Sequence, residues 1–157
     1  MFDDLDAERM LQALRAASEA FAAGEVPVGA VVYRGGRLIA RAHNQRETLR
    51  DPTAHAEMLA ITQAAAETGD WRLEGCVMYA TLEPCAMCAG ALILARLPRL
   101  VYAAADPKAG ACGSVLDVTG CKKLNHAVKI ESGLMAEASR RLLHDFFQAR
   151  RPGSRKS

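Results

Sequence analysis

The sequence predicts an α/β protein in which helices cover both faces of a mixed β-sheet. Short apolar runs alternate with alanine-rich helical stretches from residue 76 onward, and two strand-like runs flank Gly35 and Gly36 in a hairpin pattern. The length of 157 residues suits one domain. Parallel strands need crossover helices whereas a hairpin is antiparallel, so the sheet should contain both pairings.

The first part of the chain is predicted to run helix, strand, strand. Apolar residues recur at mainly helical spacing over Asp4–Ala23, and Gly24 stands where a C-terminal cap belongs. Val28–Tyr33 and Arg37–Ala42 have the composition of short strands, and the two glycines between them fit a tight turn.

The second helix is expected to begin at or just before His55. Asp51 and Pro52 are typical of an N-cap and a first helical position, and the run His55–Glu67 is rich in alanine and free of glycine and proline. His55 therefore falls in the opening turn of this helix.

Strand and helix alternate over the rest of the chain. A glycine-rich loop, DPKAGACG at 106–113, separates the last two expected elements from the others. The expected elements are a strand at Cys76–Thr81, a helix at Pro84–Ala95, a strand at Leu100–Ala104, a weak fifth strand at Ala127–Glu131 and a terminal helix at Met135–Phe147.

The ends of the chain and its cysteines indicate the compartment. The start, MFDDLDAERM, is acidic where a secretory signal would be basic, and no apolar run is long enough to span a membrane. Five irregularly spaced cysteines argue against a disulfide framework. We therefore expect a cytoplasmic protein without a membrane partner, with one domain at residues 1–149 and a basic tail at 150–157.

Basic residues gather in two places. One cluster lies just upstream of His55, and the other is the tail, so both could contact phosphate, although basic clusters are usually solvated surface. The first cluster is Arg34, Arg37, Arg41, Arg46 and Arg50, and the second is Arg150, Arg151, Arg155 and Lys156.

Two cysteines three apart, Cys85 and Cys88, follow Pro84 at the start of a predicted helix. Residues at this spacing share one helix face, and the positive end of the helix dipole favours thiolates. Buried filler or a redox pair would explain the cysteines equally well. His55 is most simply a structural histidine, but at a second helix start it could complete a three-ligand metal site with a position left for water.

Glu57 lies two residues beyond His55, an offset that would separate the two side chains in a regular helix. An acidic residue in a first helical turn is also favoured by the dipole alone. Together, however, the sequence reads His-Ala-Glu, 26 intervening residues and Pro-Cys-Ala-Met-Cys. This is the H-x-E…P-C-x-x-C signature of zinc-dependent nucleobase deaminases, in which the glutamate transfers protons.

Over nearly its whole length the chain closely resembles the bacterial tRNA-specific adenosine deaminases. The similar segments are EVPVGAVV (25–32), DPTAHAEM (51–58), TLEPCAMCAGA (81–91) and DPKAGACGS (106–114). The resemblance implies a three-layer α/β/α sandwich with a five-stranded mixed sheet of the cytidine-deaminase-like type, and a homodimer.

The resemblance also implies the site and the reaction. His55, Cys85 and Cys88 would bind one Zn²⁺ per subunit, and Glu57 would shuttle protons while a zinc-activated water attacks C6 of adenine. The reaction would convert adenosine to inosine at the wobble position of a tRNA anticodon stem-loop, with an arginine tRNA as the expected substrate. Asn44 would contact the flipped nucleotide, and Asp106 and Lys108 the RNA surface. Spacing alone, however, favours Asn44 as a simple turn former, and glycine-rich loops attract polar residues for solvation alone.

Three alternatives remain open at this point. A deaminase for a free base or nucleoside would share the metal motif. A non-catalytic, zinc-stabilised RNA-binding module would close the site with a fourth protein ligand. A redox Cys-x-x-Cys protein would have no use for His55 or Glu57. A second metal site at Cys112, Cys121 and His126 is also conceivable, whereas His43 and His144 are expected to be structural.

Overall fold

The structure is a computed structural model that describes residues 2–151 of the chain. One five-stranded sheet forms its centre, with the strands in the order β2-β1-β3-β4-β5. Strand β1 pairs antiparallel with β2 and β3, while β3, β4 and β5 are parallel to one another. The strands are β1 (Gly29–Arg34), β2 (Arg37–His43), β3 (Cys76–Leu82), β4 (Arg99–Ala104) and β5 (Lys129–Ser132).

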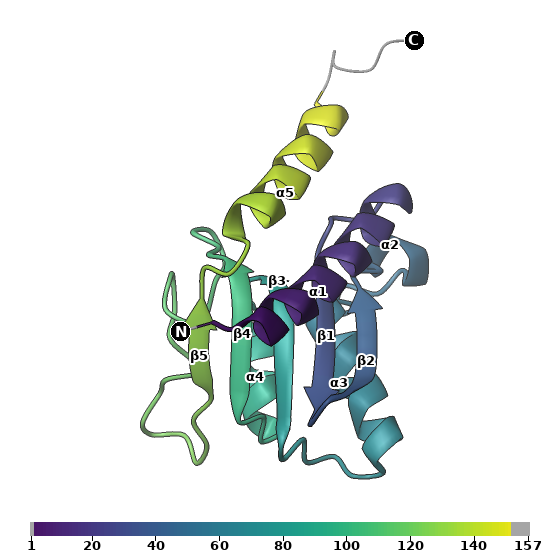
Figure 1. Ribbon diagram of the computed structural model, residues 1–157. Coiled ribbons are helices and arrows are strands. Elements are labelled where there is room, and N and C mark those ends of the chain that lie inside the picture. Colours follow the sequence, from purple (N-terminus) through teal and green to yellow (C-terminus); the bar gives the residue numbers. More distant parts are fainter. Residues whose placement is uncertain (1, 152–157) are drawn as a thin grey trace.

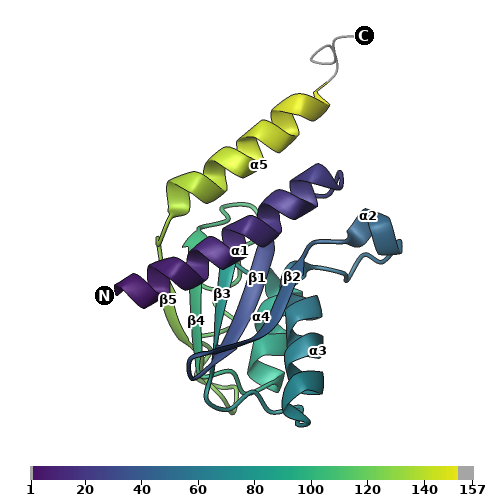
Figure 2. The same ribbon diagram turned by 45° about the vertical axis from the view of Figure 1, so that its right-hand side comes forward.

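Helices cover both faces of the sheet (Figures 1 and 2). On one face lie α1 (Asp4–Ala22) and α5 (Ala136–Arg150), and on the other lie α3 (Ala56–Thr68) and α4 (Ala86–Leu94). A short helix, α2 (Arg46–Leu49), stands beyond the end of β2. The predicted three-layer α/β/α class with a five-stranded mixed sheet is thus confirmed.

The sheet topology brings four chain segments to one edge. The carboxyl ends of β3 and β4 lie together there, since Leu82 pairs with Ala104. Because β1 runs antiparallel to β3, its start lies at the same edge, and Gly29 pairs in turn with His43 at the end of β2. Residues that precede β1 or follow β2, β3 and β4 therefore meet here.

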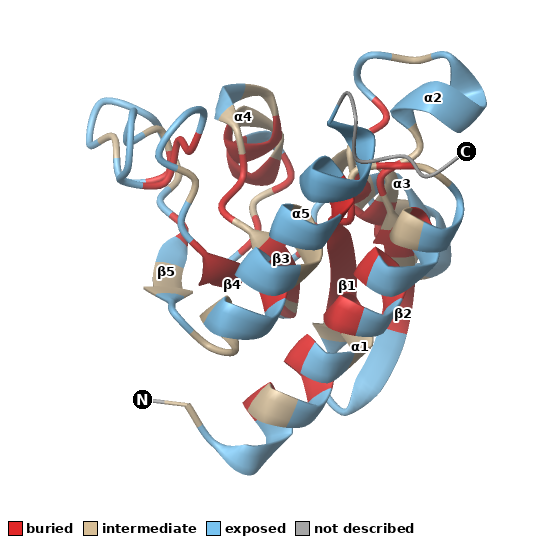
Figure 3. Ribbon diagram, turned by 90° about the horizontal axis from the view of Figure 1, so that it is seen from above, coloured by how far each residue is buried: buried red, intermediate tan, exposed pale blue. Residues whose placement is uncertain are grey.

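Each face of the sheet carries its own apolar core. Figure 3 shows that buried residues run along β1 and recur on α1 and α4. The larger core lies under α3 and α4, and the smaller one joins α1 to the sheet through side chains such as Met10, Leu14 and Val31. Helix α1 lies directly on β1, because a Cβ at Gly29 would be 2.1 Å from the carbonyl oxygen of Ala13. Only glycine fits this position.

A buried polar network joins α1 to the central strands. The Asp6 carboxylate accepts a hydrogen bond from the Tyr79 hydroxyl (2.6 Å) and two from the Arg99 guanidinium (3.1 and 3.2 Å). Arg99 also donates to Glu131 through Nε at 2.6 Å. Burial opposes ionisation of Asp6, but the hydrogen bonds from Arg99 and Tyr79 outweigh it and hold the Asp6 pKa at about 2.

The predicted start of the second helix is wrong in one respect. Asp51 is not the N-cap, because its carboxylate accepts hydrogen bonds from the backbone amide (2.8 Å) and hydroxyl (2.7 Å) of Thr53 and so closes a local turn. The helix begins later, at Ala56, with His55 as its N-cap. Likewise α4 begins two residues after Pro84, with Cys85 as its N-cap.

The other predicted helices and strands are confirmed with ends that differ by at most three residues. Helix α2 was not predicted. Helix α5 continues through Arg150, the first residue of the predicted basic tail, and residues 152–157 of that tail lie outside the described residues.

Candidate active site

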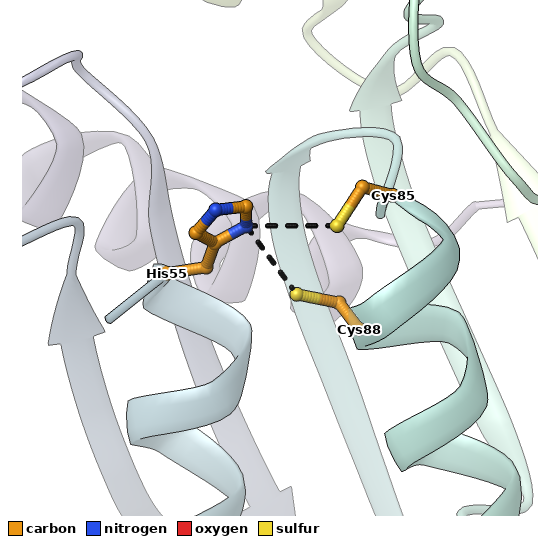
Figure 4. Close-up of side chains that lie close together, drawn as sticks. All are labelled: His55, Cys85 and Cys88. Carbon is orange, nitrogen blue, oxygen red and sulfur yellow. Dashed lines mark hydrogen bonds between the residues drawn. The ribbon is translucent and has the colours of Figure 1, made fainter. Parts of the chain in front are cut away.

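Two helix N-termini bring His55, Cys85 and Cys88 together (Figure 4). His55 is the N-cap of α3 and Cys85 the N-cap of α4, yet neither side chain makes a capping hydrogen bond to its own helix. Both side chains instead point toward each other, and Cys88 in the first turn of α4 joins them. The predicted ligand set is therefore assembled at the starts of two helices.

The spacing of these ligand atoms fits a zinc ion. The Nδ1 atom of His55 lies 3.6 Å from the Sγ atom of each cysteine. Zinc bonds of about 2.3 Å to sulfur and about 2.0–2.1 Å to nitrogen, set at the tetrahedral angle, place those two atoms about 3.6 Å apart. One nitrogen and two sulfur donors also match the ligands that zinc prefers.

In residues 2–151 these three are the only group of three potential ligands whose donor atoms all lie within 4.8 Å of one another. No fourth protein ligand therefore closes the site in this part of the chain, as a structural zinc would require. The conceivable second site at Cys112, Cys121 and His126 is not formed. Instead, the Nε2 atom of His126 lies 2.7 Å from the carbonyl oxygen of Leu97.

The ligand side chains polarise one another. The hydrogen bond from the Cys88 thiol, followed by that from His55, lowers the pKa of Cys85 to about 3. The hydrogen bond to Cys85 raises the pKa of His55, and the bond to Cys85 together with burial raises the pKa of the Cys88 thiol. These contacts favour the thiolate form of Cys85, which is the form that binds a metal ion.

Glu57 is buried beside this cluster, in the first turn of α3, with 4% of its surface exposed. Its Oε1 atom has no hydrogen-bond partner, and burial raises the pKa of the carboxyl group. A buried oxygen without a partner is rare because it is costly. Glu57 therefore presents a free proton-accepting atom at a position where a bound molecule could use it.

A pocket of about 150 Å³ opens onto His55, Glu57 and Cys85. Its volume is below the range of about 300–1,000 Å³ for drug-sized ligands, so it has room for little more than one base. It is lined by Val26, Val28, Asn44, Arg46, His55, Ala56, Glu57, Leu82, Glu83 and Cys85.

Asn44 lies in the pocket wall, as its predicted role requires, and it also forms the turn that its residue type suggests. Its side-chain amide donates to the carbonyl oxygen of Val26 (3.3 Å), and its Oδ1 accepts from the amide of Arg46 (3.3 Å).

The buried carboxylate of Glu25 accepts from the amides of Glu47 (3.1 Å) and Thr48 (2.7 Å), which fixes the start of α2.

Asp106 and Lys108 do not line the pocket. They lie on the loop after β4, where Lys108 is exposed and the Asp106 carboxylate accepts from the amides of Lys108 (3.0 Å) and Ala109 (3.2 Å). Both are thus placed where a larger substrate, but not a base in the pocket, could reach them.

The predicted basic cluster near His55 is divided by the fold. Arg37 pairs with Glu67, and Arg41 forms a two-pronged pair with Glu19 at 2.8 Å. Arg46 instead lines the pocket. Of these three arginines, only Arg46 is placed at the site.

Sequence reasoning missed Glu83 and Glu25, two carboxylates that are nearly fully buried and organise the pocket wall. Burial opposes ionisation of Glu83, but hydrogen bonds from Ser114 and from three backbone amides lower its pKa. The only signal in the sequence is a charged residue next to an apolar strand, and this does not identify the partners.

Comparisons with known proteins agree with this geometry. The family model of the MafB19-like deaminases matches residues 3–151. The chain is 45% identical over 139 residues to the tRNA-specific adenosine deaminase of Bacillus subtilis, with 88% of this chain and 86% of the relative covered. It is 49% identical over 136 residues to the enzyme of the same name from Aquifex aeolicus, with 87% and 89% covered.

Solved structures of deaminases also resemble this chain. A structure from work on A-to-I editing by tRNA:A34 deaminases at the wobble position is 43% identical, with a TM-score of 0.84 over 87% of this chain and 99% of that one. The guanine deaminase of Nitrosomonas europaea is more distant, at 27% identity and a TM-score of 0.78 over 89% of this chain and 83% of that one.

Proposed function

The chain belongs to the deaminase family that includes the bacterial tRNA-specific adenosine deaminases, and from this premise we propose that it converts adenosine to inosine at the wobble position of a tRNA anticodon. The reaction is hydrolytic: water adds its oxygen to C6 of adenine, the exocyclic C6–N6 bond breaks and ammonia leaves. One observation carries the proposal most directly, namely the buried, partnerless oxygen of Glu57 beside a three-ligand cluster in a base-sized pocket.

His55, Cys85 and Cys88 would hold the zinc ion. When bound, zinc supplies the Lewis acidity that activates water near neutral pH. At Oε1, Glu57 accepts a proton from the attacking water and donates it to N1 of adenine. It then transfers the remaining proton of that water to the departing amine. The raised pKa of the Glu57 carboxyl group suits a residue that must both accept and donate a proton.

A second hollow next to the pocket supports a substrate larger than one nucleoside. The two share Val26 and Arg46, and the hollow continues over Phe147 to Arg150 at the end of α5. Phe147 is exposed, and the Arg150 guanidinium is held by the carbonyl oxygen of Gly24 at 2.7 Å. Aromatic faces stack unpaired bases and arginines bind phosphates, so this surface suits a single-stranded RNA loop.

The size of the pocket also supports the binding of a flipped-out base. An anticodon base is unpaired, so it can enter a pocket of this size at little cost. Asn44 in the wall would hold the flipped nucleotide, while Asp106 and Lys108 would contact RNA outside the pocket. We propose an arginine tRNA as the substrate and the cytoplasm as the location.

We further propose that the protein acts as a homodimer. An apolar surface on α3, α4 and the loop before β5 supports this, because Met58, Met87, Leu94 and Leu124 line one shallow hollow and Leu94 is 71% exposed. Exposed apolar patches of this kind commonly mark interfaces. Among residues 2–151, no helix is both long and apolar enough to cross a membrane.

The second candidate is a deaminase of a free base, which the likeness to the guanine deaminase of Nitrosomonas europaea favours. The two functions separate in one experiment, in which the zinc-loaded protein is incubated with an arginine tRNA carrying adenosine at the wobble position, and separately with free adenosine, cytidine and guanine. We expect product from the tRNA alone. Turnover of a free base or nucleoside without turnover of the tRNA would favour the second candidate.

A further inference from the structure

Glu83 lies between the metal-ligand segment and the loop that carries Asp106 and Lys108. It is the second residue before Cys85, and only 2% of its surface is exposed. Its Oε1 atom accepts from the amide of Asp106 (3.0 Å) and from the hydroxyl of Ser114. Its Oε2 atom accepts from the amides of Cys112 (3.0 Å) and Ser114 (3.1 Å).

The loop is closed tightly around this carboxylate. A Cβ added at Gly110 would lie 2.3 Å from Cδ of Glu83, so the loop backbone passes too near for any side chain. The backbone on either side of the carboxylate reaches the same region. The Glu83 amide donates to the carbonyl oxygen of Ala104 (2.8 Å), and the Ala111 amide donates to that of Pro84 (2.9 Å).

These contacts differ from those of Glu57. All four donors to Glu83 come from the loop between residues 106 and 114, and neither of its oxygens lacks a partner. A carboxylate that is engaged in this way does not exchange protons with a substrate. It instead fixes the backbone from which Asp106 and Lys108 project, and it does so from a point two residues before a metal ligand.

We propose that Glu83 is a positioning residue that holds the 106–114 loop in register with the segment that begins at Cys85. The inference rests on the proposed function, because it assigns the loop to substrate binding. One side chain thereby sets the distance between the RNA-contacting loop and the ligand cluster, so that a substrate held by the loop presents its base to the pocket.

The substitution Glu83→Gln tests this proposal. The glutamine has nearly the same shape, but it turns one acceptor into a donor that faces amides or a hydroxyl, so the loop should loosen. We expect KM for an anticodon stem-loop to rise about tenfold with kcat changed less than about threefold, the pattern of lost substrate binding. Zinc per chain should not change, and amide hydrogen exchange should accelerate over residues 105–114.

Asp6→Asn is the matched control, since it removes a buried, hydrogen-bonded carboxylate from the opposite side of the sheet. It should leave KM and loop exchange unchanged. If Glu83→Gln does not fold, Ser114→Ala removes a single donor to the same carboxylate and should raise KM about threefold.

The proposal is wrong if loop exchange and KM stay at their wild-type values. It is also wrong if kcat and bound zinc fall together while KM is unchanged, because Glu83 would then act on the metal site. Hydrogen exchange needs no turnover, so it still decides the role of Glu83 if the wild-type protein forms no inosine and the proposed function fails.

Discussion

At the scale of single residues, the site depends on the different surroundings of similar groups. Glu57 and Glu83 are both buried carboxylates of the pocket, yet Glu57 has an oxygen without a partner while Glu83 accepts four hydrogen bonds. The first is free to move a proton and the second holds backbone in place. The cysteines divide in the same way, because Cys85 and Cys88 face a histidine whereas burial raises the pKa of Cys112 to about 12.

This division among the cysteines predicts which one binds metal. Cys85→Ala removes one of the three proposed ligands and should lower bound zinc well below one ion per chain, since two ligands would hold the ion weakly. Cys112→Ala also removes a buried thiol, but it should retain the metal. Elemental analysis of both purified variants after dialysis checks this, and equal zinc in the two would contradict the ligand assignment.

Some residues of the candidate site can be identified from the sequence, and others cannot. His55, Glu57, Cys85 and Cys88 fall in two short motifs whose spacing is readable directly. Glu83 and Glu25 could not be identified, because their partners lie 22 to 31 residues away and are defined only by the fold.

At the scale of helices and strands, the close packing of α1 on β1 can be tested. Gly29→Ala would place a Cβ 2.1 Å from the carbonyl oxygen of Ala13 and 2.7 Å from the amide nitrogen of Ala17. Helix and strand would have to separate, which should lower the free energy of unfolding by about 3 kcal/mol. Denaturant unfolding measures this.

Gly36→Ala is the control for the previous substitution. Nothing lies within 4 Å of a Cβ at Gly36, and this glycine does not have a positive φ. The substitution should change stability by less than about 0.5 kcal/mol. Equal effects at the two glycines would show that the contact between α1 and β1 is not as close as described.

Element starts were the least predictable part of the fold. Asp51-Pro52 has the composition of a helix start, but the Asp51 side chain bonds to Thr53 and closes a turn instead. The helix therefore begins at Ala56, and the histidine that would otherwise lie within it becomes the N-cap. This shift explains how His55 and Glu57 can serve one site despite a spacing that would part them in a regular helix.

At the scale of the whole molecule, the network around Asp6 ties α1 to β3 and β4 and makes stability depend on pH. Asp6 has a folded pKa of about 2 against an ordinary value of 3.8, so its contribution is complete above about pH 4 and is lost as the pH falls toward 2. A shift of this size corresponds to about 2 kcal/mol. Asp6→Asn should remove that part of the acid dependence, and unfolding curves between pH 2 and 7 would reveal it.

The charge distribution over the molecule makes a prediction about RNA affinity. Arg46 and Arg150 border the hollow beside the pocket, whereas Arg41 is paired with Glu19. Affinity for RNA falls as salt rises, and each phosphate contact makes the slope of log affinity against log salt more negative by about 0.7–0.9. Arg150→Ala should therefore reduce the slope by about that amount, and Arg41→Ala should leave it unchanged. Identical slopes in the two variants would place the RNA elsewhere.

Formation of inosine at the wobble position of an arginine tRNA tests the central claim most directly, with the zinc-loaded wild-type protein and Glu57→Gln compared side by side. We predict that the wild-type protein converts the adenosine and that the variant keeps its zinc but loses activity by a factor of about 10² or more. Substantial inosine formation by the zinc-loaded variant would contradict the assignment of Glu57 as the proton carrier. An inactive wild-type protein with full zinc would contradict the proposed reaction itself.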